Sequence, residues 1–128
     1  RVHFAFATAP SPGWFPDLAA LELVFEDLRA HELHYWHDAA SAHLESKLRR
    51  GASWDWLERL GPRLEGCYLS DVEGWSGGRV PGSGEVDFRE LRAQLPHRAR
   101  RVLRLEPGQS RQSALEAIRM VRVLDLDV

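Results

Sequence analysis

A glycine-rich stretch, residues 70–88, has the composition that most suggests chemistry in this sequence. It reads SDVEGWSGGRVPGSGEVDF and contains five glycines and one proline. It lies between an apolar segment that predicts a strand and a segment that predicts a helix. Loops of this length are uncommon inside a compact domain and are usually functional. Three roles are open, namely a cradle for phosphate groups, a lid over a substrate, and a flexible connection.

The phosphate role is the weakest of the three. A Walker-type phosphate loop ends in Gly-Lys-Ser or Gly-Lys-Thr, and no such tripeptide follows these glycines. Arg79, beside Pro81, is the loop cation that is able to pair with a phosphate or a carboxylate. The alternative for Arg79 is a solvated loop charge.

The bulk composition is that of one ordinary globular domain spanning residues 1–128. Apolar residues make up 44% of the 128 and charged residues 28%, which favours a folded chain with one core. Basic residues number 17 and acidic residues 19, giving a net charge of −2. A nucleic-acid-binding domain usually carries a clear basic excess. We therefore expect no nucleic-acid partner.

The number of cysteines and the hydropathy of the sequence indicate the cellular compartment. Cys67 is the only cysteine, so no disulfide can form within the chain, and a reducing, cytoplasmic compartment is favoured. The sequence has no signal peptide and no run of ~18 apolar residues, so we expect neither export nor a membrane partner. The sequence begins with Arg1, from which we expect a trimmed segment or a missing start.

Strand-like and helix-like segments alternate four times along the chain. The predicted strands cover residues 2–8, 32–38, 64–72 and 99–107. The predicted helices cover about 16–30, 42–50 and 53–61, and two more begin after the capping residues Asp87 and Ser110. Such alternation, with strands that are apolar at nearly every position, predicts an α/β fold built of βα units. We expect the four strands to run parallel, in sequence order, with the helices on one side.

Four βα units are too few for a closed (β/α)8 barrel, which needs about 200 residues. Two architectures remain open. One is a small open sheet of four strands. The other is half of a barrel that a missing segment or another chain completes.

The sequence resembles the C-terminal half of the xylose isomerase-like TIM barrels. The resemblance lies in LEGCYLSDVEGWSGGRVPGSGEVDFRELRAQLP (residues 64–96) and RVLRLEP (residues 101–107). The residues that match the loop motif Pro-Gly-x-Gly-x-x-Asp-Phe are Pro81, Gly82, Gly84, Asp87 and Phe88, while Asp38, Asp71 and Glu106 match strand ends. The resemblance implies four consecutive βα units of a TIM barrel, with the glycine-rich loop turning back across the site face.

Members of that superfamily include sugar and sugar-phosphate isomerases and epimerases, which hold a divalent metal at the ends of four strands. The resemblance implies that Asp38 and Glu106 are metal ligands here. The other family ligand positions are degenerate, because Ser41 replaces a histidine, and Tyr68 and Ser70 occupy two further histidine positions. Two carboxylates alone bind a divalent ion weakly. We expect no resident cofactor, the alternative being weakly bound Mn²⁺ or Mg²⁺.

Two carboxylates that converge without a metal repel each other, so a neighbouring cation is expected. Arg104 is the favoured counter-charge, because it lies two residues before Glu106 and shares its strand face. His43, Arg79 and a hydrogen bond from the Tyr68 hydroxyl are the alternatives.

The resemblance predicts a sugar or sugar-phosphate isomerase/epimerase-like protein whose metal-dependent chemistry is impaired or lost. The alternative is a non-catalytic TIM-barrel relative that binds a small ligand or serves as a scaffold. A nuclease of the apurinic endonuclease branch is disfavoured, since its zinc-binding histidines are missing. The candidate contacts for a small carbohydrate-like ligand are Trp14, Tyr68, Trp75 and Arg79. The expected protein partner is a missing N-terminal half or a second copy of the chain.

Overall fold

Two sheets form the framework of the protein, which is described here from a computed structural model covering residues 3–8, 16–29, 31–49 and 52–126. The main sheet has the strand order β1 (Phe4–Ala7), β2 (Leu33–Asp38), β3 (Leu64–Leu69) and β6 (Arg100–Leu103), and every neighbouring pair is parallel. The second sheet is an antiparallel hairpin of β4 (Asp71–Glu73) and β5 (Ser76–Arg79). The α/β class and the parallel, in-order main sheet confirm the sequence prediction.

The helices follow the strands of the main sheet. They are α1 (Leu18–Asp27), α2 (Ala39–Arg49), α3 (Asp55–Leu60), α4 (Phe88–Gln94) and α5 (Arg111–Val123), with a 3-10 turn at Gly61–Arg63. Two predicted caps are confirmed, because the Asp87 carboxylate accepts the backbone N–H groups of Arg89 and Glu90, and the Ser110 hydroxyl accepts that of Ser113. These side chains satisfy amide groups that have no partner inside the helix.

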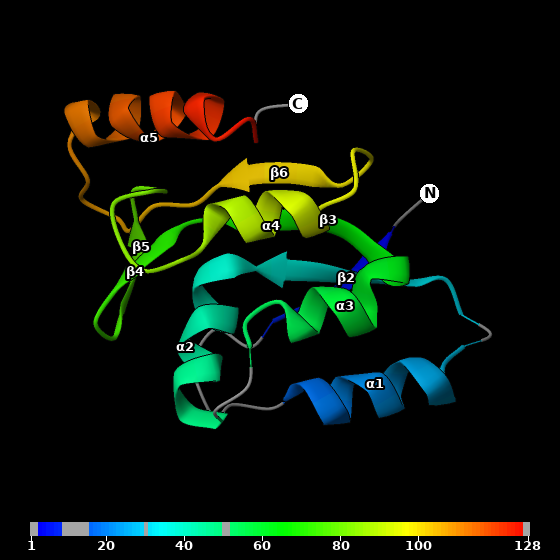
Figure 1. Ribbon diagram of the computed structural model, residues 1–128. Coiled ribbons are helices and arrows are strands. Elements are labelled where there is room, and N and C mark those ends of the chain that lie inside the picture. The colour runs from blue at the N-terminus through cyan, green and yellow to red at the C-terminus, as the bar shows by residue number, and fades with distance from the viewer. Residues whose placement is uncertain (1–2, 9–15, 30, 50–51, 127–128) are drawn as a thin grey trace.

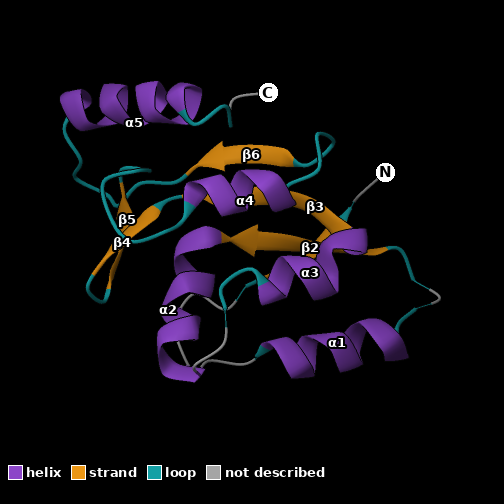
Figure 2. Ribbon diagram, viewed as in Figure 1, coloured by secondary structure: helices purple, strands orange, loops and turns teal. Residues whose placement is uncertain are grey.

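One face of the main sheet carries the hydrophobic core. Figures 1 and 2 show α1, α3 and α4 on the same side of the strands. The core on this face contains Tyr35, Leu64, Cys67 and Leu69 from the strands, Leu21 and Phe25 from α1, Trp56, Leu57 and Leu60 from α3, Phe88 and Leu91 from α4, and Leu126 beyond α5. Helices on one side of the sheet agree with the sequence prediction.

The opposite face of the main sheet is built differently. Trp36 and Tyr68 contact each other there, with ring centroids 5.2 Å apart. Gly66 makes room for the indole, since a Cβ at this position would lie 2.5 Å from the Trp36 ring. Val102, beside Tyr68 in the register, keeps 41% of its surface exposed. None of these side chains belongs to the buried core of the described residues.

The structure corrects several predicted boundaries. The third strand ends at Leu69 instead of residue 72, and the fourth ends at Leu103, so Glu106 lies three residues beyond it. Helix α2 begins at Ala39, directly after β2. The chain after β6 leaves the main sheet because the Glu106 amide donates to the Gly78 carbonyl on β5, at 3.1 Å.

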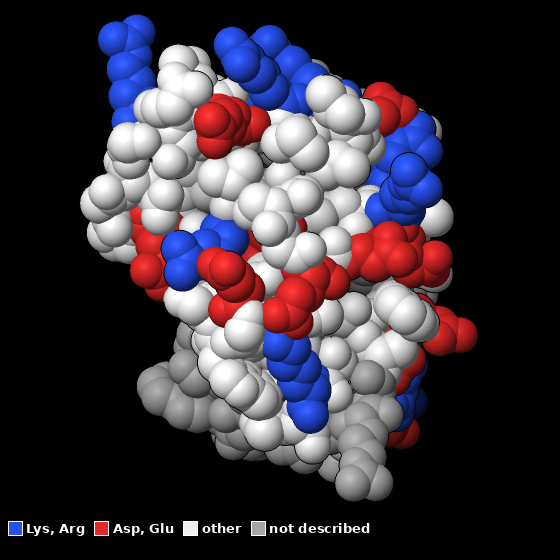
Figure 3. All heavy atoms as spheres, turned by 60° about the vertical axis from the view of Figure 1, so that its left-hand side comes forward, with Lys and Arg blue, Asp and Glu red and all other residues white. Residues whose placement is uncertain are grey.

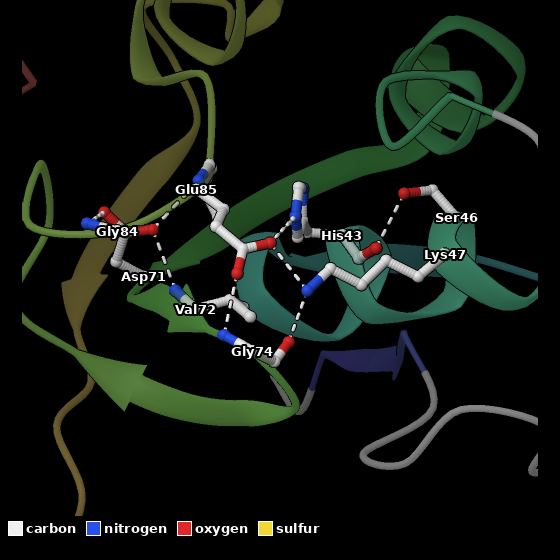
Figure 4. Close-up of polar contacts among 9 residues, drawn as sticks. His43, Ser46, Lys47, Asp71, Val72, Gly74, Gly84 and Glu85 are labelled. Carbon is white, nitrogen blue, oxygen red and sulfur yellow. Dashed lines mark hydrogen bonds and ion pairs between the residues drawn. The ribbon is translucent and has the colours of Figure 1, made fainter.

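The glycine-rich stretch is folded around the carboxylate of Asp71. This fully buried side chain accepts four backbone N–H groups, those of Val72, Gly82, Gly84 and Val86, at 2.8–2.9 Å. Figure 4 shows part of this arrangement. The stretch expected to be a loop therefore contains the β4–β5 hairpin, followed by a turn that returns to the carboxylate. The hydrogen bonds of Asp71 reach residues up to 15 positions away, so local sequence patterns do not predict them.

Gly84 is a position where a side chain would break this arrangement. A Cβ there would lie 2.1 Å from the Val72 carbonyl oxygen and 2.8 Å from Asp71 Oδ1. We expect Gly84→Ala to lower the free energy of unfolding by about 1–3 kcal/mol, as overpacking does. Urea denaturation measures this.

Gly61→Ala is the matched control for that substitution. Nothing lies within 4 Å of a Cβ at residue 61, and its φ of −52° suits any residue. Stability should be unchanged or slightly raised. Equal losses in the two variants would contradict the role assigned to Gly84.

Candidate functional site

A pocket of about 280 Å³ opens at the carboxyl ends of the main strands. Ligands of parallel α/β sheets bind at this end, where loops from different strands meet. The lining residues are Asp38, Ala40, Ser41 and Leu44 from the β2–α2 region, Ser70 after β3, Trp75, Gly77 and Gly78 from the hairpin, and residues 104–107 after β6. Of the predicted site residues, the structure brings Asp38, Trp75 and Glu106 together here.

Asp38 and Arg104 form an ion pair at the base of the pocket. Asp38 is 4% exposed, and its Oδ2 accepts a hydrogen bond from Arg104 Nη1 at 2.8 Å. Its Oδ1 accepts the backbone N–H of Ser41 at 3.1 Å. The Arg104 guanidinium also lies over the Tyr68 ring, 5.1 Å from its centroid. The prediction that Arg104 is the counter-charge is confirmed.

Glu106 approaches the same pocket from the chain beyond β6. A Cβ added to Gly78 would lie only 2.3 Å from the Glu106 Cγ, and the φ of Gly78 is +70°. Glycine at residue 78 therefore allows the side chain of Glu106 to pack against the hairpin. Unlike Asp38, Glu106 is exposed to solvent. The two carboxylates share one pocket, but only one of them is buried.

The residues of this pocket do not fit a divalent metal centre of the kind that the resemblance implies. Both oxygens of Asp38 already have partners, one of them the Arg104 guanidinium. The pocket lining contains no histidine and no carboxylate other than Asp38 and Glu106. Zinc and manganese sites usually combine at least three protein ligands. We therefore derive no chemical step through a metal at these residues.

A cluster around Glu85 holds the hairpin against α2, as Figure 4 shows. The Glu85 carboxylate contacts Lys47 Nζ at 2.6 Å, accepts the Gly74 backbone N–H at 2.7 Å, and lies 3.2 Å from His43 Nε2. These contacts, that of Lys47 first, lower the pKa of Glu85 to about 2. Lys47 Nζ also lies 5.3 Å from the centroid of the Trp75 ring. The cluster therefore positions the tip of the hairpin beside the pocket.

Several candidate residues lie elsewhere. Tyr68 is on the open face of the main sheet, below Arg104, and does not line the pocket. Arg79 faces Glu73 across the hairpin, at 3.8 Å, and does not line it either. His43 pairs with Glu85 instead of Asp38. Trp14 lies outside the described residues.

A buried polar chain fixes the end of β2 from the other side. The Asp38 amide donates to Thr8 Oγ1 at 3.0 Å, Thr8 Oγ1 lies 2.7 Å from Tyr35 Oη, and Tyr35 Oη lies 2.8 Å from His37 Nδ1. Burial lowers the pKa of His37 to about 3, which keeps the imidazole neutral. His37 faces the helices, opposite to Asp38, as the strand alternation predicts. This series of hydrogen bonds joins the residue after β1 to β2 beneath the pocket.

Lys47 and Glu85 hold the hairpin beside the pocket without lining it, and the sequence did not single them out for this role. Glu85 occupies a variable position of the loop motif, and Lys47 is one polar residue among several of α2. Their contacts join residues 38 positions apart, so no spacing rule points to them.

The comparisons with known proteins give no information on function, so the functional argument rests on the geometry of the site. No family model and no curated protein matches the chain. The class that the fold defines is an α/β protein with a four-stranded parallel sheet and a polar pocket at its carboxyl edge. None of its described helices has the length and apolar character needed to cross a membrane.

Asp38→Asn removes the charge that Arg104 neutralises and tests the structural role of the pair. We expect the free energy of unfolding to fall by about 1–2 kcal/mol, because a charged hydrogen bond is lost although Arg104 remains half-exposed. Urea denaturation at neutral pH measures the loss. Glu106→Gln is the control, since this exposed carboxylate should change stability by less than about 0.5 kcal/mol. A larger loss in the control would contradict the assignment.

Proposed function

We propose that this chain is an isomerase-like α/β protein that binds a small, uncharged sugar or polyol in the pocket at the carboxyl edge of the sheet, without metal-dependent isomerase chemistry. The observation that carries the proposal is the Asp38–Arg104 ion pair. This pair places a hydrogen-bond acceptor and a donor side by side where a catalytic metal would need a free carboxylate.

The chemistry of the lining suits hydroxyl groups. A sugar hydroxyl both donates and accepts hydrogen bonds, and the pocket offers both kinds of partner. Arg104 has five N–H donors, of which the bond to Asp38 uses one. Ser41 and Ser70 add hydroxyls, and Glu106 adds an acceptor. The Trp75 ring supplies an apolar surface for the C–H face of a sugar.

The charge of the pocket favours a neutral ligand over an anionic one. Two carboxylates and one guanidinium line it, so a phosphate or carboxylate group on the ligand would meet net negative charge. Figure 3 shows acidic and basic side chains interspersed on the hairpin side of the surface. A free sugar therefore fits the lining better than a sugar phosphate.

Calorimetric titration with a panel of neutral sugars, polyols and the corresponding phosphates tests this function. We expect a neutral member to bind, and Arg104→Gln and Trp75→Ala each to raise its Kd at least tenfold, about 1.4 kcal/mol. Trp54→Ala is the matched control, because Trp54 is an exposed tryptophan outside the pocket. Its Kd should be unchanged.

Three results would contradict the proposal. They are binding restricted to the phosphates, a Kd that is unaffected by substitution of Arg104, and metal-dependent interconversion of a sugar that Asp38→Asn abolishes. The last result would favour the hypothesis of an active isomerase over that of a non-catalytic relative.

For the architecture, we propose that the four βα units form half of a (β/α)8 barrel. The parallel, in-order strands support this, as does the core on one face. The other face carries Trp36 and Tyr68, and parallel sheets are normally covered on both faces. Further βα units, of a longer chain or of a second copy, would cover these aromatic rings.

Light scattering at several concentrations tests the half-barrel directly. The chain should self-associate, because the uncovered face would otherwise expose apolar surface to water. Val102→Glu, on that face, should weaken the association. Val123→Glu is the control, since Val123 is exposed on α5. A stable monomer at every concentration, with no missing N-terminal half, would contradict the half-barrel.

A further inference from the structure

The geometry points to a second site, at the opposite end of the sheet from the pocket. We propose that His3, His34 and Glu65 bind a transition-metal ion of the Zn²⁺ type. One ligand atom from each of the three residues lies within 4.8 Å of the other two. This site is independent of the proposed sugar-binding pocket.

Three neighbouring strands supply the three side chains. His3 directly precedes β1, His34 is the second residue of β2, and Glu65 is the second residue of β3. In the parallel register, His34 lies beside Ala5. Because successive side chains of a strand alternate, His34 lies on the face opposite to its buried neighbour Tyr35. The site therefore joins the amino ends of strands that are distant in the sequence.

The distances suit coordination better than they suit direct contacts among the three side chains. His34 Nδ1 lies 3.7 Å from Glu65 Oε2, which is too long for a hydrogen bond. Two ligands bound tetrahedrally to one zinc ion at about 2.0–2.2 Å are about 3.4 Å apart. The His3 and His34 rings are nearly parallel, at an interplanar angle of 19° and a centroid separation of 5.5 Å. An imidazole binds a metal in the plane of its ring, so the exposed His3 ring would turn for its nitrogen to share one ion with His34 and Glu65.

The second nitrogen of His34 strengthens the inference. His34 Nε2 is buried and has no hydrogen-bond partner among the described residues. Neither ring nitrogen of His34 is thus committed to a short hydrogen bond, and the imidazole remains able to bind a metal.

Two histidines and one carboxylate are a ligand set that zinc commonly uses, with water in the fourth position. Arg100 is the competing cation, with Nη2 at 3.6 Å from Glu65 Oε1. Its side chain is 73% exposed, so it is free to move away when an ion binds. The sequence prediction of no bound metal considered only the carboxyl ends of the strands.

A bound ion would have a mechanical effect on β1. All four residues of this edge strand are exposed; it pairs with β2 on one side and contacts α1 through the Phe6 and Phe25 rings. An ion shared by His3, His34 and Glu65 would tie β1 to two further strands. Because such an ion binds only the folded chain, it should raise the melting temperature.

The experiment titrates chelator-treated protein with Zn²⁺ by calorimetry and with Co²⁺ by visible absorption. We expect one equivalent of Zn²⁺ to bind, the melting temperature to rise, and Co²⁺ to give the strong absorption of a tetrahedral site. His3→Gln and Glu65→Gln should each raise the Kd for Zn²⁺ at least tenfold and remove the rise in melting temperature. His3 is exposed and outside the sheet, so this variant should fold.

Two control variants separate this site from other ligands. His97→Gln removes an exposed histidine outside the cluster, and Glu106→Gln removes a carboxylate of the pocket. Both should bind Zn²⁺ as the unmodified chain does. The proposal is overturned if no stoichiometric Zn²⁺ binds, or if binding survives His3→Gln or Glu65→Gln. A Kd that rises in Glu106→Gln instead would assign the ion to the pocket.

Discussion

The carboxylate of Asp71 is the constraint on which the carboxyl end of this protein depends. It is completely buried, and a buried charge is tolerated only when hydrogen bonds replace the lost water. Four backbone amides, spread over the next fifteen residues, provide those bonds. Because the carboxylate gathers all four, the segment has to leave the sheet, turn back, and return before α4 begins. The sequence analysis matched Asp71 to a strand end, whereas the structure places it at the start of β4, where it organises the loop.

The hairpin that results from this folding forms one wall of the pocket. Strand β5 receives the backbone of Glu106, and Gly78 leaves space for its side chain. On the other side, Glu85 ties Gly74 to Lys47 of α2. The pocket is therefore enclosed by elements from three parts of the chain, and its shape depends on contacts between them. Such a preformed wall suits the binding of a small rigid ligand.

The polar groups of the sheet are divided between its two ends. At the carboxyl end, Asp38 is satisfied internally by Arg104, which removes the free carboxylate that metal chemistry requires. At the amino end, His34 and Glu65 face each other without a short hydrogen bond. Between the two ends lies a face bearing Trp36 and Tyr68, which are amphipathic rings suited to an interface. Among the described residues, the same sheet thus carries a neutralised site, a cluster without a short hydrogen bond and a face of half-buried aromatic rings.

The sequence by itself determined the α/β class, the number and order of the main strands, and the helix starts at Asp87 and Ser110. These features follow from local periodicity and from capping side chains, which act within a few residues. It also predicted Arg104 as the counter-charge, although β6 ends at Leu103 and the pairing of Arg104 with Asp38 is a tertiary contact. Only the tertiary structure decided the β4–β5 hairpin, the Glu85 cluster, and the meeting of His3, His34 and Glu65. The hairpin depends on the amides that Asp71 gathers, the contacts of Glu85 join residues 11 to 42 positions apart, and the two histidines and Glu65 meet across neighbouring strands, where register sets the distances.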